Sequence, residues 1–220
     1  MQAAGLAVDT MTDVLGIVDL QPTFMPGGEL PVAGGDEIVP VINRLLRDHF
    51  RQSFATQDWH PAGHTSFASS HPGRKPYDVV SMPYGPQVLW PDHALQGTSN
   101  AALHPDLEAD RITLILRKGW RAELDSYSAF YENDGVTRTG LAGWLADRGV
   151  RRLFLTGLAA DFCVAWSAED AIGAGVETFV IEDATRAIDL PQLDGTTSAT
   201  QARERLEALG VRFIQSSELI

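Results

Sequence analysis

The chain has 220 residues, of which 44% are hydrophobic and 21% charged, and its formal net charge at pH 7 is −12. A chain of this length can bury about 70% of the surface that it exposes when unfolded, and this composition excludes a disordered or fibrous protein. The 17 basic residues are scattered among 29 acidic ones, which argues against nucleic-acid binding, and no apolar run approaches the roughly 20 residues of a membrane span.

The two ends of the chain and its single cysteine indicate where the protein works. Residues 1–12 are predicted to be an N-terminal extension of one domain over residues 13–220, since no linker or internal repeat interrupts the remainder. The first residues lack the basic and apolar regions of a secretion signal. One cysteine, Cys163, excludes an intrachain disulfide and suits a reducing compartment. We therefore expect a cytoplasmic protein.

Short β-branched runs alternate with helical patterns along the chain. The predicted order is strand 14–19, helix 36–49, strand 50–57, strand 111–117, helix 139–148, strand 151–158, helix 161–174, strand 176–182, helix 197–209 and strand 211–215. Glycines at positions 149, 175 and 210 end three of the helices. Repeated β-then-α order predicts a single-domain, three-layer α/β/α fold with a parallel six-stranded sheet.

A long segment, residues 58–106, separates the second and third predicted strands. It is rich in Pro, Gly and His and shows little periodicity. A loop this long within a compact domain is usually functional.

Reactive side chains follow several of the predicted strands. Asp19 ends the first strand, Asp58 and His60 follow the second, Lys118 follows the third, and Cys163 lies just beyond the fourth, in the first turn of the next helix. In open α/β sheets, ligands bind at the carboxyl ends of the strands. These five residues are therefore expected to converge at one edge of the sheet.

Each of these residues also has an ordinary structural interpretation. A lone cysteine is most often an inert buried thiol, but a helix N-terminus favours the thiolate, and N–H groups near Ala159 and Cys163 would suit an oxyanion. Asp19 is either a strand-end cap or a base that takes the thiol proton. Lys118 is one of only two lysines beside fifteen arginines, and a buried ammonium is tunable in a way that a guanidinium is not.

Four residues form a possible metal site. Asp58, His60 and His64 lie within seven residues of one another, and His93 lies further along the same aperiodic region. Aspartate and histidine ligands suit a divalent transition metal such as zinc, iron or manganese.

Five segments together resemble the nicotinamidase/pyrazinamidase family, within the isochorismatase-like cysteine hydrolases. They are VDLQPTF (18–24), DWHPAGHTSF (58–67), LWPDHALQGT (89–98), KGWRAELDSYSAF (118–130) and TGLAADFCVAWSAEDA (156–171). The resemblance covers most of the chain, and the segments occur in the family's order. It implies a metal-containing cysteine amidohydrolase that converts nicotinamide to nicotinic acid and ammonia through a thioester, in NAD salvage, and that also acts on pyrazinamide.

The resemblance also implies roles for individual residues. The catalytic triad falls on Cys163, Asp19 and Lys118, with the oxyanion hole at Ala159 and Cys163 beside a cis Leu158–Ala159 peptide. The implied ligands of one divalent metal, zinc before iron or manganese, are Asp58, His60, His93 and, as a fourth, His64. Aromatic walls for the substrate ring fall on Phe24, Trp90 and Tyr127. The expected binding partner is the small-molecule substrate, nicotinamide or pyrazinamide. The oligomeric state is not predicted.

Two alternatives remain at the level of the sequence. One is a related amidase acting on another small amide, such as a carbamoyl compound, against which the full metal set argues. The other is a non-catalytic metal-binding or ligand-sensing module, against which the intact Cys163, Asp19 and Lys118 argue.

Overall fold

A computed structural model describes residues 5–220 of the chain. Its main sheet has the strand order β5-β2-β1-β6-β7-β8, and every pairing within it is parallel. The strands are β1 (Asp13–Val18), β2 (Ser53–Asp58), β5 (Leu114–Lys118), β6 (Arg152–Leu158), β7 (Glu177–Arg186) and β8 (Arg212–Ile214).

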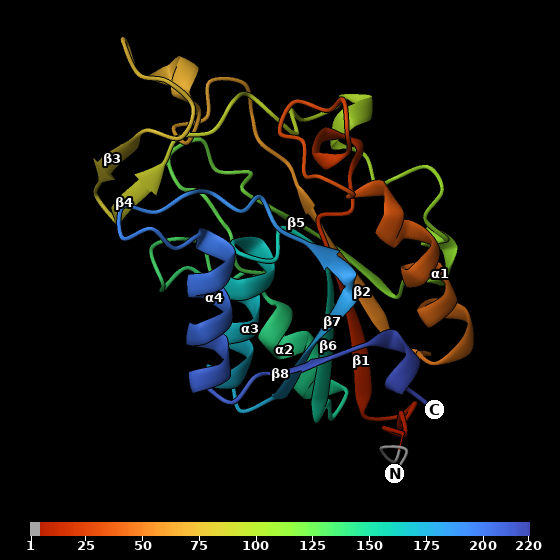
Figure 1. Ribbon diagram of the computed structural model, residues 1–220. Helices are drawn as coiled ribbons and strands as arrows, with labels where there is room; N and C mark the ends of the chain where they lie inside the picture. The colour runs from red at the N-terminus through yellow and green to blue at the C-terminus, as the bar shows by residue number, and fades with distance from the viewer. Residues whose placement is uncertain (1–4) are drawn as a thin grey trace.

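Helices cover both faces of this sheet. They are α1 (Val39–Asp48), α2 (Leu141–Asp147), α3 (Cys163–Gly173) and α4 (Ser198–Ala208). In Figure 1, α1 lies on one face, and α2, α3 and α4 lie on the other. The predicted three-layer α/β/α fold with a six-stranded parallel sheet is confirmed.

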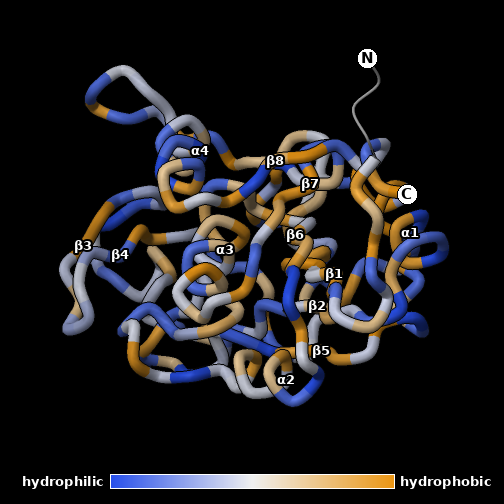
Figure 2. The backbone as a smooth tube through the Cα atoms, turned by 90° about the horizontal axis from the view of Figure 1, so that it is seen from below, coloured by the Kyte–Doolittle hydropathy of each residue, from blue (hydrophilic) through white to orange (hydrophobic). Residues whose placement is uncertain are grey.

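Burial of apolar side chains on both faces holds the central strands in place. Every residue of β1 is buried, as is typical of a parallel strand covered by helices on both sides. Phe154 of β6 stacks on Phe179 of β7, with ring centroids 4.5 Å apart. Figure 2 shows hydrophilic and hydrophobic residues alternating along the helices, which is the pattern of helices that pack one face on a core.

The structure differs from the sequence prediction in the long segment and at the ends of several elements; β2 and β5, for example, each begin three residues later than predicted. The long segment 58–106 contains an antiparallel hairpin of β3 (Val79–Met82) and β4 (Gly85–Val88). Each strand has only four residues, most of them not fully buried, so the alternating pattern is too short to detect. Strand β7 runs four residues further than predicted, to Arg186, and α3 begins at Cys163 instead of at residue 161.

The first described residues and the C-terminus lie side by side (Figure 1). The Leu6 N–H donates to the Glu218 carbonyl, and the Ile220 N–H donates to the Leu6 carbonyl. Of the predicted N-terminal extension, residues 1–4 lie outside the described residues. Among residues 5–220, no helix is both long and apolar enough to cross a membrane.

The strand order reverses between β1 and β6, because β2 and β5 follow on one side and β7 and β8 on the other. Such a switch point is where ligands bind in open α/β sheets. The ends of β1 and β6 approach closely there because residue 157 is glycine. Its φ is 100°, and a Cβ atom would lie 2.1 Å from the Val18 carbonyl oxygen. The carboxyl ends of these two strands therefore open directly onto the switch point.

Candidate active site

Lys118 contacts three of the reactive residues that the sequence predicted at this edge of the sheet. It is the last residue of β5, and its Nζ lies 2.8 Å from Asp19 Oδ2 and 3.4 Å from Cys163 Sγ. Nζ also pairs with Asp58 and donates to the Ser126 carbonyl at 2.9 Å. All three triad residues are buried. One ammonium thus contacts two carboxylates and the only thiol of the chain.

Protonation at this cluster is unusual. Burial, reinforced by Asp58, raises the pKa of Asp19 to about 6, against the influence of Lys118. Burial also raises the pKa of the Cys163 thiol well above its ordinary value, against the influence of Lys118 and with a further contribution from Asp19 and Asp58. Lys118 would lose its proton more easily because it is buried, but Asp19 and Asp58 hold its pKa well above the usual range. The resting cluster therefore contains a protonated thiol beside a carboxylate that titrates near neutral pH.

Asp19 is held by a residue that the sequence analysis missed. Thr56 of β2 donates through Oγ1 to Asp19 Oδ1 at 2.6 Å, and its Oγ1 accepts the Asp19 N–H at 3.0 Å. Asp19 itself lies in the left-handed region, with φ 47°. A buried threonine inside a strand carries no sequence signal for this role.

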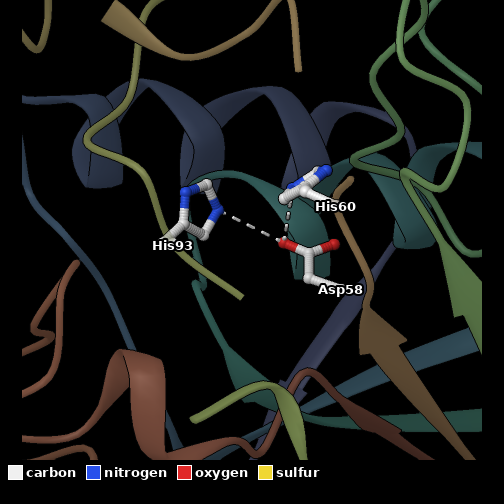
Figure 3. A group of neighbouring side chains, drawn as sticks. All are labelled: Asp58, His60 and His93. Carbon is white, nitrogen blue, oxygen red and sulfur yellow. Dashed lines mark ion pairs between the residues drawn. The ribbon is translucent and has the colours of Figure 1, made fainter. Parts of the chain in front are cut away.

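A group of metal-ligating side chains adjoins the triad. Figure 3 shows His60 and His93 directed at the Asp58 carboxylate. Their Nε2 atoms lie 3.7 and 3.6 Å from Asp58 Oδ2. These separations are too long for hydrogen bonds but suit donors around a shared ion. Each ring is oriented through Nδ1, His60 at 2.8 Å from the Gly119 carbonyl and His93 at 2.8 Å from the Pro91 carbonyl.

Backbone carbonyls bonded to Nδ1 leave Nε2 of His60 and His93 free for a metal, a common arrangement around ligating histidines. Gly119 makes the His60 contact possible. Its φ is 64°, and a Cβ atom there would lie 2.3 Å from His60 Cε1. Burial alone would raise the pKa of Asp58, but Lys118 and the two histidines hold it well below its usual range. Asp58 is therefore an anionic ligand at neutral pH.

His64 is the fourth predicted ligand, and its ring lies next to that of His60, with ring centroids 4.4 Å apart. It groups with His60 and with Asp125, a buried carboxylate that the sequence analysis missed. The Ser66 N–H donates to His64 Nδ1 at 3.1 Å, so in the neutral ring the hydrogen lies on Nε2. That Nε2 is buried and, among residues 5–220, has no hydrogen-bond partner. A buried N–H group that has no protein acceptor and lies in this group fits a position next to an ion, where it can donate to another ligand of that ion.

The predicted ring walls line one small cavity together with Cys163. Phe24, Trp90 and Tyr127 are all buried, and the Trp90 Nε1–H donates to the Tyr127 hydroxyl at 3.0 Å. Three further lining residues were not found from the sequence, because nothing in their local pattern marks them: Leu30, Phe162 and Ile188. The cavity thus has apolar and aromatic walls, with the thiol and the metal group at its base.

The turn between β6 and α3 supplies the remaining groups. The Leu158–Ala159 peptide is cis, as expected. The N–H groups of Phe162 and Val164 both donate to the Ala159 carbonyl at 3.1 Å. Within residues 5–220, the N–H groups of Ala159 and Cys163 donate to no backbone or side-chain acceptor. Two residues that line the cavity therefore have free N–H groups.

Known proteins share this chain's sequence and fold. A family model for the isochorismatase domain matches residues 13–216. The nicotinamidase of Acinetobacter baylyi is 49% identical over 204 residues, which cover 93% of this chain and 92% of that protein. The solved structure of an Acinetobacter baumanii nicotinamidase/pyrazinamidase is 48% identical, with a TM-score of 0.90, over 94% of this chain and 98% of that one. The solved structure of the pyrazinamidase of Pyrococcus horikoshii, in complex with zinc, is 31% identical, with a TM-score of 0.71. The match covers 92% of this chain and 98% of that one.

The metal group generates a direct prediction. The purified protein should contain about one divalent metal ion per chain, and His60→Ala should lower this content to nearly none, because it removes one of three convergent ligands. Elemental analysis of the two proteins is the measurement. His104→Ala serves as the control, since His104 lies outside the group and its Nδ1 accepts the Asp106 N–H. A metal content that His60→Ala leaves unchanged would contradict the assignment.

Proposed function

The chain belongs to the isochorismatase family, and from its active-site geometry we propose that it hydrolyses nicotinamide to nicotinic acid and ammonia, and pyrazinamide to pyrazinoic acid. The observation that carries this proposal is the Lys118 ammonium, which lies between Asp19 and Cys163 and also pairs with Asp58 of the metal group. That arrangement suits covalent hydrolysis of a carboxamide on a metal-oriented ring. The proposed setting is NAD salvage in the cytoplasm.

The first half of the reaction forms a thioester. Asp19 accepts the proton of the Cys163 thiol, and the sulfur attacks the carboxamide carbon, which becomes tetrahedral. The developing oxyanion takes hydrogen bonds from the free N–H groups of Ala159 and Cys163. One such donor contributes about 3 kcal/mol to catalysis. Asp19 then gives its proton to the amide nitrogen, the C–N bond breaks, and ammonia leaves.

The second half returns the enzyme to its starting state. Asp19 takes a proton from water, and the oxygen attacks the thioester carbon. The C–S bond breaks, the sulfur recovers its proton from Asp19, and the carboxylic acid product is released. Lys118 keeps Asp19 in place and offsets the negative charge that passes between carboxylate and sulfur.

The metal is proposed to be zinc, with Asp58, His60 and His93 as its protein ligands and His64 as the fourth member of the site. Three protein ligands with an open position are typical of zinc sites that bind small molecules, and the zinc-bound Pyrococcus pyrazinamidase supports this choice over iron or manganese. When bound, the ion supplies a Lewis acid for the ring nitrogen of the substrate, which fixes the ring's orientation.

The cavity walls match a flat aromatic substrate. Phe24, Trp90 and Tyr127 present ring faces and edges around a small space, and the Tyr127 hydroxyl is held by the Gln87 Nε2 at 2.7 Å. A rigid wall favours one planar ring and orients its carboxamide towards Cys163. These three residues are the proposed substrate-binding side chains.

Ammonia release is the direct test of the proposed function. The wild-type protein should release ammonia from nicotinamide, and Cys163→Ala should abolish this release while the circular dichroism spectrum stays unchanged, because the thiol is the nucleophile. Iodoacetamide should inactivate the wild type, with nicotinic acid protecting. A Cys163→Ala variant that keeps a tenth of the wild-type turnover would remove Cys163 from this role. Release from a carbamoyl compound but not from nicotinamide would favour a different amidase.

Activity should also require a lysine at position 118, beyond its positive charge. A compact ammonium fits among Asp19, Asp58 and Cys163, whereas a guanidinium is longer and planar. Lys118→Arg should therefore lose kcat/KM on the order of 100-fold, close to the loss in Lys118→Ala. The exposed Lys75→Arg is the matched control and should be silent. Near-wild-type kcat/KM in Lys118→Arg would mean that charge alone is needed.

The raised pKa of Asp19 predicts the acid limb of the pH profile. Protonated Asp19 cannot accept the thiol proton, so kcat/KM should fall as the pH drops through about 6. Thr56→Val removes a hydrogen bond that favours the carboxylate, which should move this limb to higher pH by about one unit. Thr178→Val, at a buried threonine bonded only to the Val176 carbonyl within the described chain, should leave it in place. An unmoved limb in Thr56→Val would show that another group titrates.

A further inference from the structure

Asp161 is a buried carboxylate in the turn between Ala159 and Cys163, and the reaction proposed above does not use it. It is 5% exposed. Its Oδ1 accepts the Ile188 N–H at 3.0 Å, and its Oδ2 accepts the Asp189 N–H at 2.8 Å and the hydroxyl of Ser198. One side chain of the nucleophile turn therefore binds two successive N–H groups of the segment that follows β7.

The same segment is held at its next residue by Ser198, the first residue of α4. The Leu190 N–H donates to Ser198 Oγ at 2.7 Å, and the Ser198 N–H donates to the Leu190 carbonyl at 2.8 Å. Asp189 lies in the left-handed region, with φ 62°. Asp161 and Ser198 thus fix three consecutive backbone N–H groups, at residues 188, 189 and 190.

This anchoring matters to the active site because Ile188 lines the substrate cavity with Phe162 and Cys163. The nucleophile turn has separate support from its own backbone. The Ala160 N–H donates to the Arg186 carbonyl at 2.8 Å, and the Phe162 N–H donates to the Ala159 carbonyl. Loss of the Asp161 carboxylate would therefore free Ile188 more than it would displace Cys163.

We propose that Asp161 is a positioning residue that holds Ile188 as a wall of the substrate cavity and thereby sets the affinity for the aromatic ring. The proposal rests on the proposed function for the identity of that ring. Asp161 acts through Ile188 and does not touch the reacting atoms. Its contribution should accordingly appear in substrate binding and not in turnover.

The test is Asp161→Asn. This change keeps the size of the side chain, but it replaces one of the two oxygens that accept the Ile188 and Asp189 N–H groups by an NH₂ group, which cannot accept a hydrogen bond. We expect KM for nicotinamide to rise about tenfold, the scale of a lost apolar pocket contact, with kcat within about threefold of wild type. Asp183→Asn is the matched control. Asp183 binds the Ser216 N–H at 2.8 Å and the Ser216 hydroxyl in the same way, but it does not line the cavity. It should lower thermal stability and leave KM unchanged.

A double-mutant cycle identifies the route of the effect. Ile188→Ala alone should raise KM to a similar extent, and adding Asp161→Asn to it should raise KM less than twofold further, because both changes remove one wall. Unchanged KM in Asp161→Asn, a fall in kcat with KM unchanged, or fully additive effects would each overturn the proposal. If Asp161→Asn does not fold, Ser198→Ala is the second variant. It removes the hydroxyl's bonds to Asp161 and to the Leu190 N–H but leaves both carboxylate bonds to residues 188 and 189, so it should show a smaller rise in KM.

Alkylation separates this proposal from the proposed function. Cys163 is the only cysteine, so uptake of iodoacetamide reports on the cavity whatever the substrate is. Asp161→Asn should be alkylated several-fold faster than wild type, and Asp183→Asn at the wild-type rate. A wild type that releases no ammonia from nicotinamide would overturn the proposed function, whereas equal alkylation rates together with equal KM would overturn only the role of Asp161.

Discussion

The active site depends on one buried ammonium that stabilises two buried carboxylates. Taking Lys118, Asp19 and Asp58 out of water costs several kcal/mol for each ion, and their mutual attraction offsets that cost only while all three are present. Two carboxylates that share a cation do not have the same pKa, because the negative charge of each one disfavours ionisation of the other. Asp58 has the histidines on its far side and stays ionised, while the pKa of Asp19 rises to about 6. One pair of aspartates thus contains a carboxylate that titrates at about pH 6 and one that stays ionised.

The topology brings these charges together without long-range bending of the chain. The strands β5, β2, β1 and β6 are consecutive in the sheet, so their carboxyl ends present Lys118, Asp58, Asp19 and the Cys163 turn in spatial order. A lysine side chain is long enough to reach across its neighbouring strand to the next. Because residues 157 and 119 are glycines, Val18 and His60 can lie closer to the backbone at these two positions than a Cβ atom would allow. Close packing at two glycines therefore sets the dimensions of the site.

Hydrogen bonds to neighbouring groups fix the side chains and the segment that line the cavity. Histidine rings are oriented by backbone carbonyls, Tyr127 is held by Trp90 and Gln87, and the segment bearing Ile188 is held by Asp161. Such supporting contacts restrict the rotamers of the groups that meet the substrate, which is how a site keeps its geometry in the absence of ligand. In the proposed reaction, these supporting contacts hold the walls around the ring of the substrate, and Cys163, Asp19 and Lys118 act on its amide.

The order of the six sheet strands and four helices could be predicted from the sequence, because a buried parallel strand and an amphipathic helix have distinct apolar periods. The sequence also determined that Asp19, Asp58, Lys118 and Cys163 meet, since all four follow strands of one parallel sheet. Only the tertiary structure decided that Thr56 holds Asp19, that Asp125 adjoins His60 and His64, and that Ile188 closes the cavity. The partners in these contacts lie far apart along the chain, 37 residues in the case of Thr56 and Asp19. Local periodicity carries no information about which side chains meet across the sheet, so the grouping of His64 with Asp125 emerged only from the folded chain.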